Sequence, residues 1–224
     1  MSNFGVHRLR LVNPYAVAFR EARSAVGASH LLKAAEEFKS IAVAVADCTL
    51  VIGTTAVRNR ALHHPLRRLD AETSLTIREQ LRAGRVALLF GSEKIGLTND
   101  DFSHCHWLLN IPTEASHISL NLGQAVAVCL HEIARSERAS AETGSTPSAT
   151  PDAAPATAGE AEKITATLLE ALHRSGYVKP GNDAVSEKKV RSLMLRLNLS
   201  SGDAKVLLGM VRQIAWKLRR VGKD

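Results

Sequence analysis

Aromatic residues, cysteines and long apolar runs are all scarce in this chain of 224 residues. Aromatic residues make up only 4% of the chain, which argues against base stacking as the main means of holding a nucleic acid. No run approaches the roughly 20 apolar residues of a membrane span, and the first residues contain no signal-peptide core. The three cysteines have no C-x-x-C spacing, which predicts reduced thiols and excludes a disulfide scaffold. We therefore expect a cytoplasmic protein that does not enter a membrane.

A biased segment interrupts an otherwise ordinary composition of 45% hydrophobic and 23% charged residues. Residues 136–159 consist mostly of Ala, Ser, Thr, Pro and Gly and contain no Ile, Leu, Val, Met or aromatic residue. Because such a segment cannot anchor a core, we predict a flexible linker there. It divides the chain into a first domain, residues 1–135, and a C-terminal domain, residues 160–224.

The positive charge is concentrated in the C-terminal domain. The whole chain has 29 Lys and Arg against 22 Asp and Glu, a net charge of +7. Residues 160–224 alone hold 13 Lys and Arg against seven Asp and Glu, a net charge of +6. This concentration is typical of a protein that binds the phosphate backbone of a nucleic acid, with a solvated basic helical surface as the alternative.

Helical periodicity in the C-terminal domain predicts three helices, near residues 163–175, 186–197 and 201–221. Apolar residues of the last helix recur on one face, which predicts a buried stripe. That stripe comprises Leu207, Met210, Val211, Ile214 and Leu218. Arginines elsewhere on this helix would face solvent or a ligand, and they are Arg212, Arg219 and Arg220.

The first domain alternates short β-rich runs with helical patterns, which predicts an α/β fold with a mainly parallel sheet. The apolar runs LVIG and VALLFG show no polar alternation, so we expect helices on both faces of the sheet. A helix near residues 122–135 would bury Cys129 as a core thiol. The predicted strands are residues 9–13, 49–54, 86–91 and 107–111, and the other predicted helices lie near residues 20–26 and 74–83.

Several common catalytic motifs are absent. Gly91 and Gly96 flank a run that resembles a phosphate-binding loop, but Leu97 and Thr98 stand where that loop needs Lys and Ser or Thr. The chain has no G-x-G-x-x-G after a strand and no G-x-S-x-G nucleophile elbow. Three consecutive side chains at 104–106, His-Cys-His, alternate between faces in an extended segment, so we predict no metal site.

Three predicted strand ends are rich in small residues. They are Gly53-Thr54-Thr55-Ala56, Phe90-Gly91-Ser92-Glu93, and Ile111-Pro112 followed by Ser119-Leu120-Asn121-Leu122. Ligands of parallel α/β sheets bind beyond the carboxyl ends of the strands, where small residues expose backbone hydrogen-bonding groups. Any one loop is equally well explained as a tight turn, with Thr98 and Asn121 capping helices. Three such loops in succession favour a common pocket.

Two motifs resemble those of SpoU/TrmH-type SPOUT methyltransferases. FGSEKIGLTNDDF resembles the signature F-G-x-E-x-x-G-L-T-N-x-E-L, and IPTEASHISLNLGQAVAVCLHEI resembles the segment I-P-x(n)-S-L-N-L-x-x-A-V. RLRLVNPY, the run at Gly27–Ser29, ADCTLVIGTTAVRNR and the linked helical tail match the TrmJ subgroup, which methylates the ribose 2′-hydroxyl of nucleotide 32 in the tRNA anticodon loop. The resemblance covers nearly the whole chain.

The resemblance implies a SPOUT domain with a C-terminal trefoil knot, a homodimer, and S-adenosylmethionine as methyl donor for tRNA or another structured RNA. Glu93, Asn99 and Asn121 lie in the motifs and would brace loops or touch ligands. The cofactor-binding residues carried over are Thr54, Thr55, Ala56, Gly91, Ile111, Ser119 and Leu120. The RNA-binding candidates are Arg8, Arg58 and Arg60, with Arg212, Arg219 and Arg220 from the tail.

The family's catalytic arginine belongs to its first motif, N-x-G-x-x-x-R-A-M. Met1 to Gly5 align with the end of that motif, so no catalytic residue is assigned in this sequence. Either the natural protein carries an upstream segment and is an RNA 2′-O-methyltransferase, or the chain is a non-catalytic RNA-binding protein with a vestigial pocket. The intact cofactor motifs favour the first interpretation.

Overall fold

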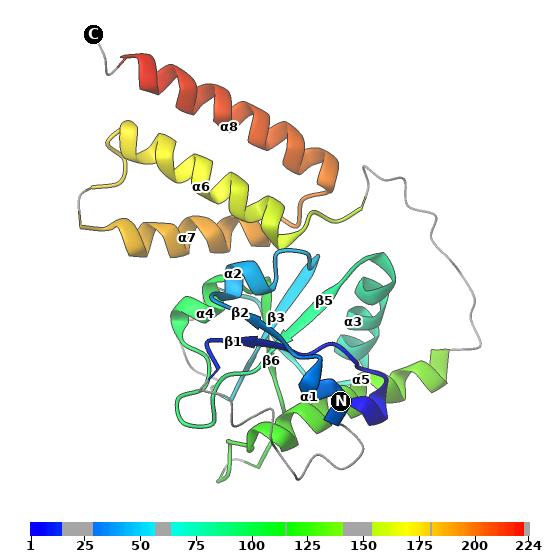
Figure 1. Ribbon diagram of the computed structural model, residues 1–224. Helices are drawn as coiled ribbons and strands as arrows, with labels where there is room; N and C mark the ends of the chain where they lie inside the picture. Colours follow the sequence, from blue (N-terminus) through cyan, green and yellow to red (C-terminus); the bar gives the residue numbers. More distant parts are fainter. Residues whose placement is uncertain (15–28, 57–63, 115, 141–153, 180, 222–224) are drawn as a thin grey trace.

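A computed structural model of the protein describes residues 1–14, 29–56, 64–114, 116–140, 154–179 and 181–221 (Figure 1). It confirms an α/β fold with parallel strands. The main sheet has four strands in the order β4-β6-β3-β5, all parallel. These strands are β3 (Leu50–Thr55), β4 (Leu66–Arg68), β5 (Val86–Leu89) and β6 (Trp107–Asn110). The predicted helix near residues 20–26 lies outside the described residues.

Helices cover both faces of this sheet, as its uninterrupted apolar runs predicted. On one face α3 and α5 pack against each other, and Ile77 and Cys129 enter a core with Leu50 and Ile52. On the other face the neighbouring residue Val51 packs near α2 and α4. Cys129 is fully buried, so its prediction as a core thiol is confirmed. The helices are α2 (Ile41–Ala44), α3 (Ala71–Ala83), α4 (Asn99–Ser103) and α5 (Leu122–Ser140).

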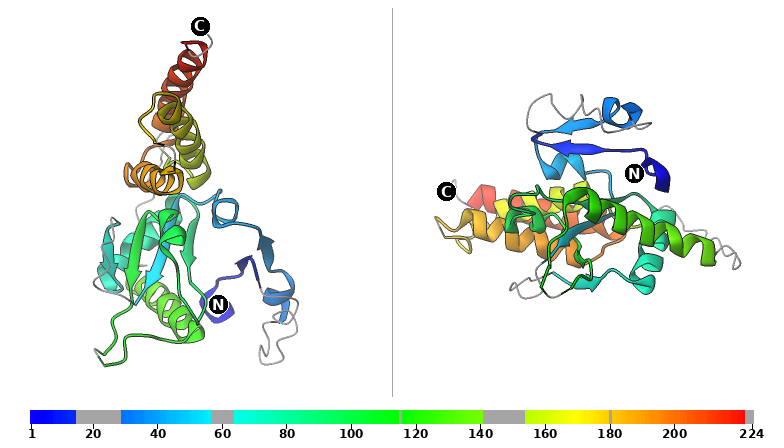
Figure 2. Two further views of the ribbon diagram at one scale, coloured as in Figure 1. Left: turned by 90° about the vertical axis from the view of Figure 1, so that its left-hand side faces the viewer. Right: turned by 90° about the horizontal axis from the view of Figure 1, so that it is seen from below.

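The predicted strand at residues 9–13 forms, but outside the main sheet. Strand β1 (Arg10–Val12) pairs in parallel with β2 (Glu36–Phe38), and the helix before β2 is α1 (Ser29–Lys33). Figure 2 shows this pair set apart from the four-stranded sheet. Arg10 connects the two parts, because its guanidinium lies 2.5 Å from Asp47 Oδ1. The hydrogen bond from Arg10 holds the pKa of Asp47 well below its usual value.

Three helices form the C-terminal part, with α6 packed against both α7 and α8 (Figure 1). Helix α8 has the predicted bounds. Helix α6 begins five residues before the predicted start, because Thr157 and Glu160 form a capping box there. It therefore starts inside the segment predicted as linker, and α5 also continues five residues into that segment. The helices are α6 (Ala158–Arg174), α7 (Asp183–Arg196) and α8 (Ser201–Val221).

The prediction that Met210 and Ile214 belong to the buried stripe of α8 is wrong. Met210 is 59% exposed and Ile214 is 54% exposed. The buried line of α8 instead runs through Ala204, Val211 and Ala215, where small side chains allow close approach to α6. Because α6 covers only one side of α8, residues at the flank of that line stay in solvent. In the described part of the chain no helix has the length and apolar character that crossing a membrane requires.

Candidate methyl-donor pocket and RNA-facing arginines

A cavity of about 320 Å³ lies at the carboxyl ends of β3, β5 and β6. Parallel strands end at one edge of their sheet, so the loops that follow them meet there. All the residues predicted as cofactor-binding line this cavity, which confirms that the three strand ends share one pocket. They are Thr54, Thr55, Ala56, Gly91, Ile111, Ser119 and Leu120. Their role toward a ligand stays a prediction.

The loop after β5 closes tightly on itself. A Cβ atom at Gly91 would lie 2.0 Å from the carbonyl carbon of Gly96 and 2.3 Å from the backbone nitrogen of Leu97. Gly96 has a positive φ of 68° and donates its N–H to the Ser92 carbonyl at 2.8 Å. Both glycines are therefore required by the backbone of this loop, and both line the cavity.

The two motif segments FGSEKIGLTNDDF and IPTEASHISLNLGQAVAVCLHEI both cap a helix and line the pocket. Thr98 is the N-cap of α4 and forms a capping box with Asp101. Asn121 accepts a hydrogen bond from the Gln124 N–H at 2.7 Å, at the start of α5. Both predicted caps are thus confirmed beside the pocket that the same segments line. Asn99 is the first residue of α4, and its side chain has no role in these caps.

Side-chain hydrogen bonds join the three strand ends beside the cavity. Thr54 Oγ1 donates to the Leu89 carbonyl at 2.9 Å and so joins β3 to β5. Asn110 Nδ2 donates to the Thr55 carbonyl at 3.0 Å and joins β6 to β3. These polar groups hold the three strand ends at one level, which preorganises the pocket before any ligand enters.

Sequence reasoning missed eight of the 19 residues that line the cavity. Of the loop between β5 and α4 it placed only Phe90-Gly91-Ser92-Glu93 at the pocket, although the motif FGSEKIGL already marked the whole run. Most of the missed residues are apolar and supply hydrophobic surface. The missed lining residues are Lys94, Ile95, Gly96, Leu97, Phe102, Thr113, Ile118 and Ala125.

The predicted RNA-binding arginines differ in whether they already form an ion pair within the chain. Arg8 forms a bidentate pair with Glu36, with N···O distances of 2.5 and 2.9 Å. Arg219 forms a bidentate pair with Glu170 at 2.7 and 2.6 Å, and this pair lowers the pKa of Glu170 to about 2. Arg8 and Arg219 would therefore have to break an ion pair with a glutamate before either could bind a phosphate. Arg58 and Arg60 lie outside the described residues.

Two tail arginines are better placed for a phosphate. Arg212 is exposed on α8, and within the described part of the chain it has no ion-pair partner. The Arg220 guanidinium lies 4.9 Å from the centre of the Trp216 ring, an arrangement that leaves its donors available. On the first domain Arg67 and Arg68 are also exposed, on the edge strand β4. The three-residue strand LRR has no alternation of apolar and polar residues, so the sequence pattern did not predict it.

The His-Cys-His run is structural. Cys105 and His106 are buried, and His106 Nδ1 accepts a hydrogen bond from the Val51 N–H at 3.0 Å. Burial lowers the pKa of His106 to about 4, so the imidazole is neutral at pH 7. Within the described ranges no group of three His, Cys, Asp or Glu side chains is arranged to bind a metal.

Comparison with known proteins is consistent with this site. Residues 1–131 match the SpoU rRNA methylase family. The tRNA (cytidine/uridine-2′-O-)-methyltransferase TrmJ of Klebsiella pneumoniae is 32% identical over 217 residues, which are 96% of this chain and 87% of that protein. Its counterpart in Yersinia pestis strain Pestoides F is 30% identical and covers 96% of this chain and 83% of that protein.

Solved structures agree over nearly the full length. The crystal structure of TrmJ from Z. mobilis ZM4 matches with a TM-score of 0.81 and 30% identity, over 96% of this chain and 89% of that chain. A probable methylase family protein from Haemophilus influenzae Rd KW20 matches with a TM-score of 0.56 and 26% identity, over 97% and 87%. The motifs, the pocket and these matches together establish that the chain belongs to the SpoU rRNA methylase family.

Proposed function

We propose that the protein is an S-adenosylmethionine-dependent tRNA ribose 2′-O-methyltransferase, acting at nucleotide 32 of the anticodon loop. The observation that carries this proposal is the convergence of the predicted cofactor residues of three strand ends on one cavity. The similarity to tRNA 2′-O-methyltransferases over 96% of the chain supports the choice of substrate. Because tRNA is cytoplasmic, the same proposal places the protein in the cytoplasm.

The cavity suits a molecule with a flat base and a polar tail. Its volume of about 320 Å³ falls within the usual range of small-molecule sites, roughly 300–1,000 Å³. Apolar side chains such as Ile95, Ile111 and Leu120 supply surface for a base, and the closed Gly91 loop supplies backbone donors and acceptors. The bound methyl donor would supply an electrophilic methyl group on a positively charged sulfur.

The contribution of the chain itself is positioning. Methyl transfer to a ribose hydroxyl needs the oxygen in line with the methyl group, and rigid placement of both partners accounts for much of such a rate enhancement. Thr54 and Asn110 join the strand ends by hydrogen bonds, and Gly91 and Gly96 allow the loop after β5 to close tightly on itself. Together these contacts would keep the donor in one orientation and shield it from water.

We further propose that the segment between β6 and α5 is threaded through the loop between β5 and α4, giving a trefoil knot. Both segments line the same cavity, as a thread and its surrounding loop would. Such a knot is a rare exception to the rule that chains do not thread their own loops. In the same proposal α6, α7 and α8 form a small all-helical C-terminal domain that helps to hold RNA.

Calorimetric titration of the 224-residue chain with S-adenosylmethionine and with S-adenosylhomocysteine tests the cofactor part of this proposal. We expect saturable binding of both compounds at one site per chain. Adenine alone serves as a control for base binding without the amino-acid part. Absence of saturable heat in a sample whose circular dichroism shows the folded chain would contradict the proposal.

RNA binding should depend on salt through the tail. In a titration of tRNA at several salt concentrations, we expect Arg212→Ala and Arg220→Ala each to weaken binding. Each should also reduce the slope of log K against log salt by about 0.7–0.9, because each removes one phosphate contact. Arg219→Ala should change the slope less, since Glu170 already neutralises this side chain. Equal slopes for Arg212→Ala and the unchanged protein would exclude Arg212 from the RNA contact.

The proposal includes a homodimer whose interface completes the RNA site. Leu122 and Val128 on α5 and Ile118 before it are between 39% and 49% exposed. Large apolar side chains left in solvent near a pocket mark a surface that another chain can cover. Light scattering should give twice the mass of one chain. A measured mass equal to that of a single chain would contradict the homodimer and with it the RNA site shared between two chains.

A further inference from the structure

The C-terminal helices are docked on the first domain by backbone groups. The first N–H groups of a helix have no partner within the helix. In α6 the Ala158 N–H donates to the Cys48 carbonyl at 2.8 Å, and the Gly159 N–H donates to the Ala46 carbonyl at 3.0 Å. A Cβ atom at residue 159 would lie 2.7 Å from the Ala46 carbonyl oxygen, so glycine is needed for this approach.

Arg191 of α7 adds a buried polar connection at the same interface. Its side chain forms a bidentate pair with Glu162 at 2.8 and 3.0 Å, and it also pairs with Glu187. Its remaining guanidinium nitrogen donates to Ser103 Oγ at 3.1 Å. Arg191 is only 6% exposed and Ser103 is 1% exposed. Glu162 and Glu187 compensate the charge of Arg191, and the Ser103 hydroxyl is the acceptor that the structure shows for the third guanidinium nitrogen, so loss of this bond would leave a buried donor without its partner.

Helix α4 carries this connection from the interface to the pocket. Ser103 is its last residue, and the preceding residue, Phe102, lines the methyl-donor pocket. The tail lies near the amino ends of the strands, since Cys48 comes just before β3, whereas the pocket lies at their carboxyl ends. The loop after β5 and the short helix α4 lead the chain from the pocket edge back to the edge that meets the tail.

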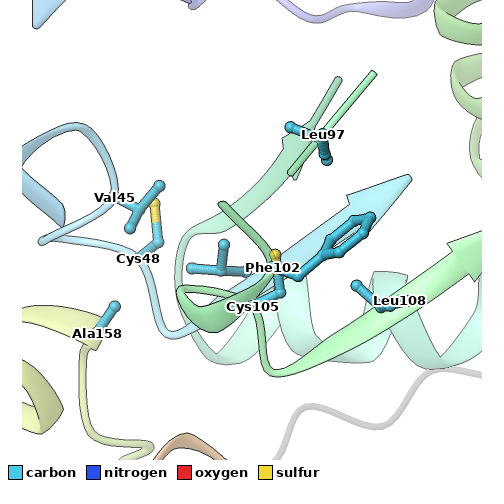
Figure 3. Packing of buried hydrophobic residues seen from close by; sticks show 8 residues of the cluster. Val45, Cys48, Leu97, Phe102, Cys105, Leu108 and Ala158 are labelled. Carbon is cyan, nitrogen blue, oxygen red and sulfur yellow. The ribbon is translucent and has the colours of Figure 1, made fainter. Parts of the chain in front are cut away.

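The apolar core makes the same connection. Ala158 of α6 belongs to a buried cluster with Val45, Cys48, Leu97 and Phe102 (Figure 3). Leu97 and Phe102 also line the pocket. A small displacement of the tail is therefore transmitted through close-packed side chains to the pocket wall, because packed interiors leave little room for independent movement.

We propose that Arg191 is a positioning residue for the methyl-donor site: by holding Ser103 it fixes α4 and the pocket wall formed by Leu97 and Phe102. The tail then does more than bind RNA, because its docking contributes directly to the affinity for the methyl donor. This inference rests on the proposed function for the identity of the ligand. The dependence of the position of α4 on Arg191 does not rest on the proposed function.

Two variants of the full chain test the proposal. Arg191→Met removes all the contacts of the guanidinium and leaves the bond from Ser103 Oγ to the Asp100 carbonyl within α4 in place. Ser103→Ala removes both bonds of the hydroxyl and leaves the pairs of Arg191 with Glu162 and Glu187 intact. Arg174→Met is the matched control, because Arg174 pairs with Glu170 inside the tail at 3.0 Å and lies outside the interface. Ser103→Ala keeps the test valid if Arg191→Met does not fold.

The first readout is hydrogen exchange without ligand, at the Gly96 and Phe102 amides. These amides donate to the Ser92 carbonyl at 2.8 Å and the Thr98 carbonyl at 3.0 Å. We expect their exchange to be about tenfold faster in Ser103→Ala and Arg191→Met, and unchanged in Arg174→Met. Unchanged exchange in both interface variants would overturn the inference, whatever ligand the pocket binds.

The second readout is the affinity for S-adenosylhomocysteine. We expect the dissociation constant to rise about fivefold in Ser103→Ala and more in Arg191→Met, with the salt dependence of tRNA binding unchanged. In the same variants of the chain extended by the N-x-G-x-x-x-R-A-M motif, the KM for S-adenosylmethionine should rise without a rise in the KM for tRNA. If the unchanged protein binds no S-adenosylhomocysteine, the proposed function fails and hydrogen exchange alone decides the inference.

Discussion

Replacing Gly91 with valine is expected to abolish binding of S-adenosylhomocysteine. The new Cβ atom would meet the backbone of Gly96 and Leu97 at 2.0–2.4 Å, well inside any allowed contact. Backbone atoms cannot rotate away as the end of a flexible side chain can, so the loop would have to open. Because Gly91, Gly96 and Leu97 all line the cavity, its wall would be lost. Titration should show a loss of affinity of more than about a hundredfold.

Gly209→Ala is the matched control for this prediction. Gly209 lies inside α8, and apart from the neighbouring residues and backbone of its own helix nothing lies within 4 Å of the place where its Cβ would stand. Alanine should therefore raise the free energy of unfolding by about 0.5–1 kcal/mol and leave the affinity unchanged. If a folded Gly91→Val variant bound S-adenosylhomocysteine as tightly as the unchanged protein does, the Gly91 loop would not be part of the ligand site.

The free energy of unfolding should fall by about 2.5 kcal/mol between pH 7.5 and pH 4.5 because of His106 alone. Burial lowers the pKa of His106 to about 4 in the folded chain, whereas an unfolded histidine titrates near 6.5. Between these two values the unfolded state binds a proton that the folded state does not bind. The contribution of His106 is therefore complete above pH 6.5 and is lost as the pH falls toward 4.

The His106→Asn variant separates this contribution from those of other groups. Asparagine offers a side-chain oxygen near the position of Nδ1, so it retains an acceptor for the Val51 N–H but does not titrate. Urea unfolding at pH 7.5 and pH 4.5 should show a smaller decrease for His106→Asn, by about 2.5 kcal/mol. Burial also lowers the pKa of His104. The contributions of His104 and of the carboxylates are the same in both proteins, so they cancel in the difference between the two decreases. Equal decreases would show that His106 is protonated without penalty in the folded state.

Strands and pocket were predictable because each has a local signature with one physical consequence. Runs such as LVIG and VALLFG are long and apolar enough to indicate strands covered on both faces. Parallel strands end at one edge, so small residues after three of them predicted a shared cavity without any knowledge of side-chain positions. The motif resemblance then indicated the methyl donor as ligand, which geometry alone could not do.

Short elements escaped prediction because tertiary pairing creates them. Strands β2 and β4 read EEF and LRR, with no alternation of apolar and polar residues, and each exists because a neighbouring strand offers its edge. The docking of α6 was missed for the opposite reason. Ala158 and Gly159 belong to a segment whose small residues predicted a linker, but small residues are also what a close backbone contact requires.

The position of α8 relative to α6 also could not be read from periodicity. Met210 and Ile214 fit the apolar face of α8 when that helix is considered alone. The partner helix covers a narrower line, through Val211 and Ala215, and leaves the larger side chains exposed. Amphipathic pattern indicates which face is apolar, but the width of the buried part depends on the helix that packs against it.

Mapping the methyl group on tRNA tests the proposed function most directly. The tRNA transcript is incubated with methyl-labelled S-adenosylmethionine and either the 224-residue chain or the same chain extended before Met1 by a segment that carries the N-x-G-x-x-x-R-A-M motif. A 2′-O-methyl group protects the adjacent phosphodiester from alkali, so we expect the label from the extended chain in one alkali-resistant dinucleotide that contains nucleotide 32. No alkali-resistant label from either chain, when both bind S-adenosylhomocysteine and tRNA, would contradict ribose methylation and leave a non-catalytic RNA-binding protein.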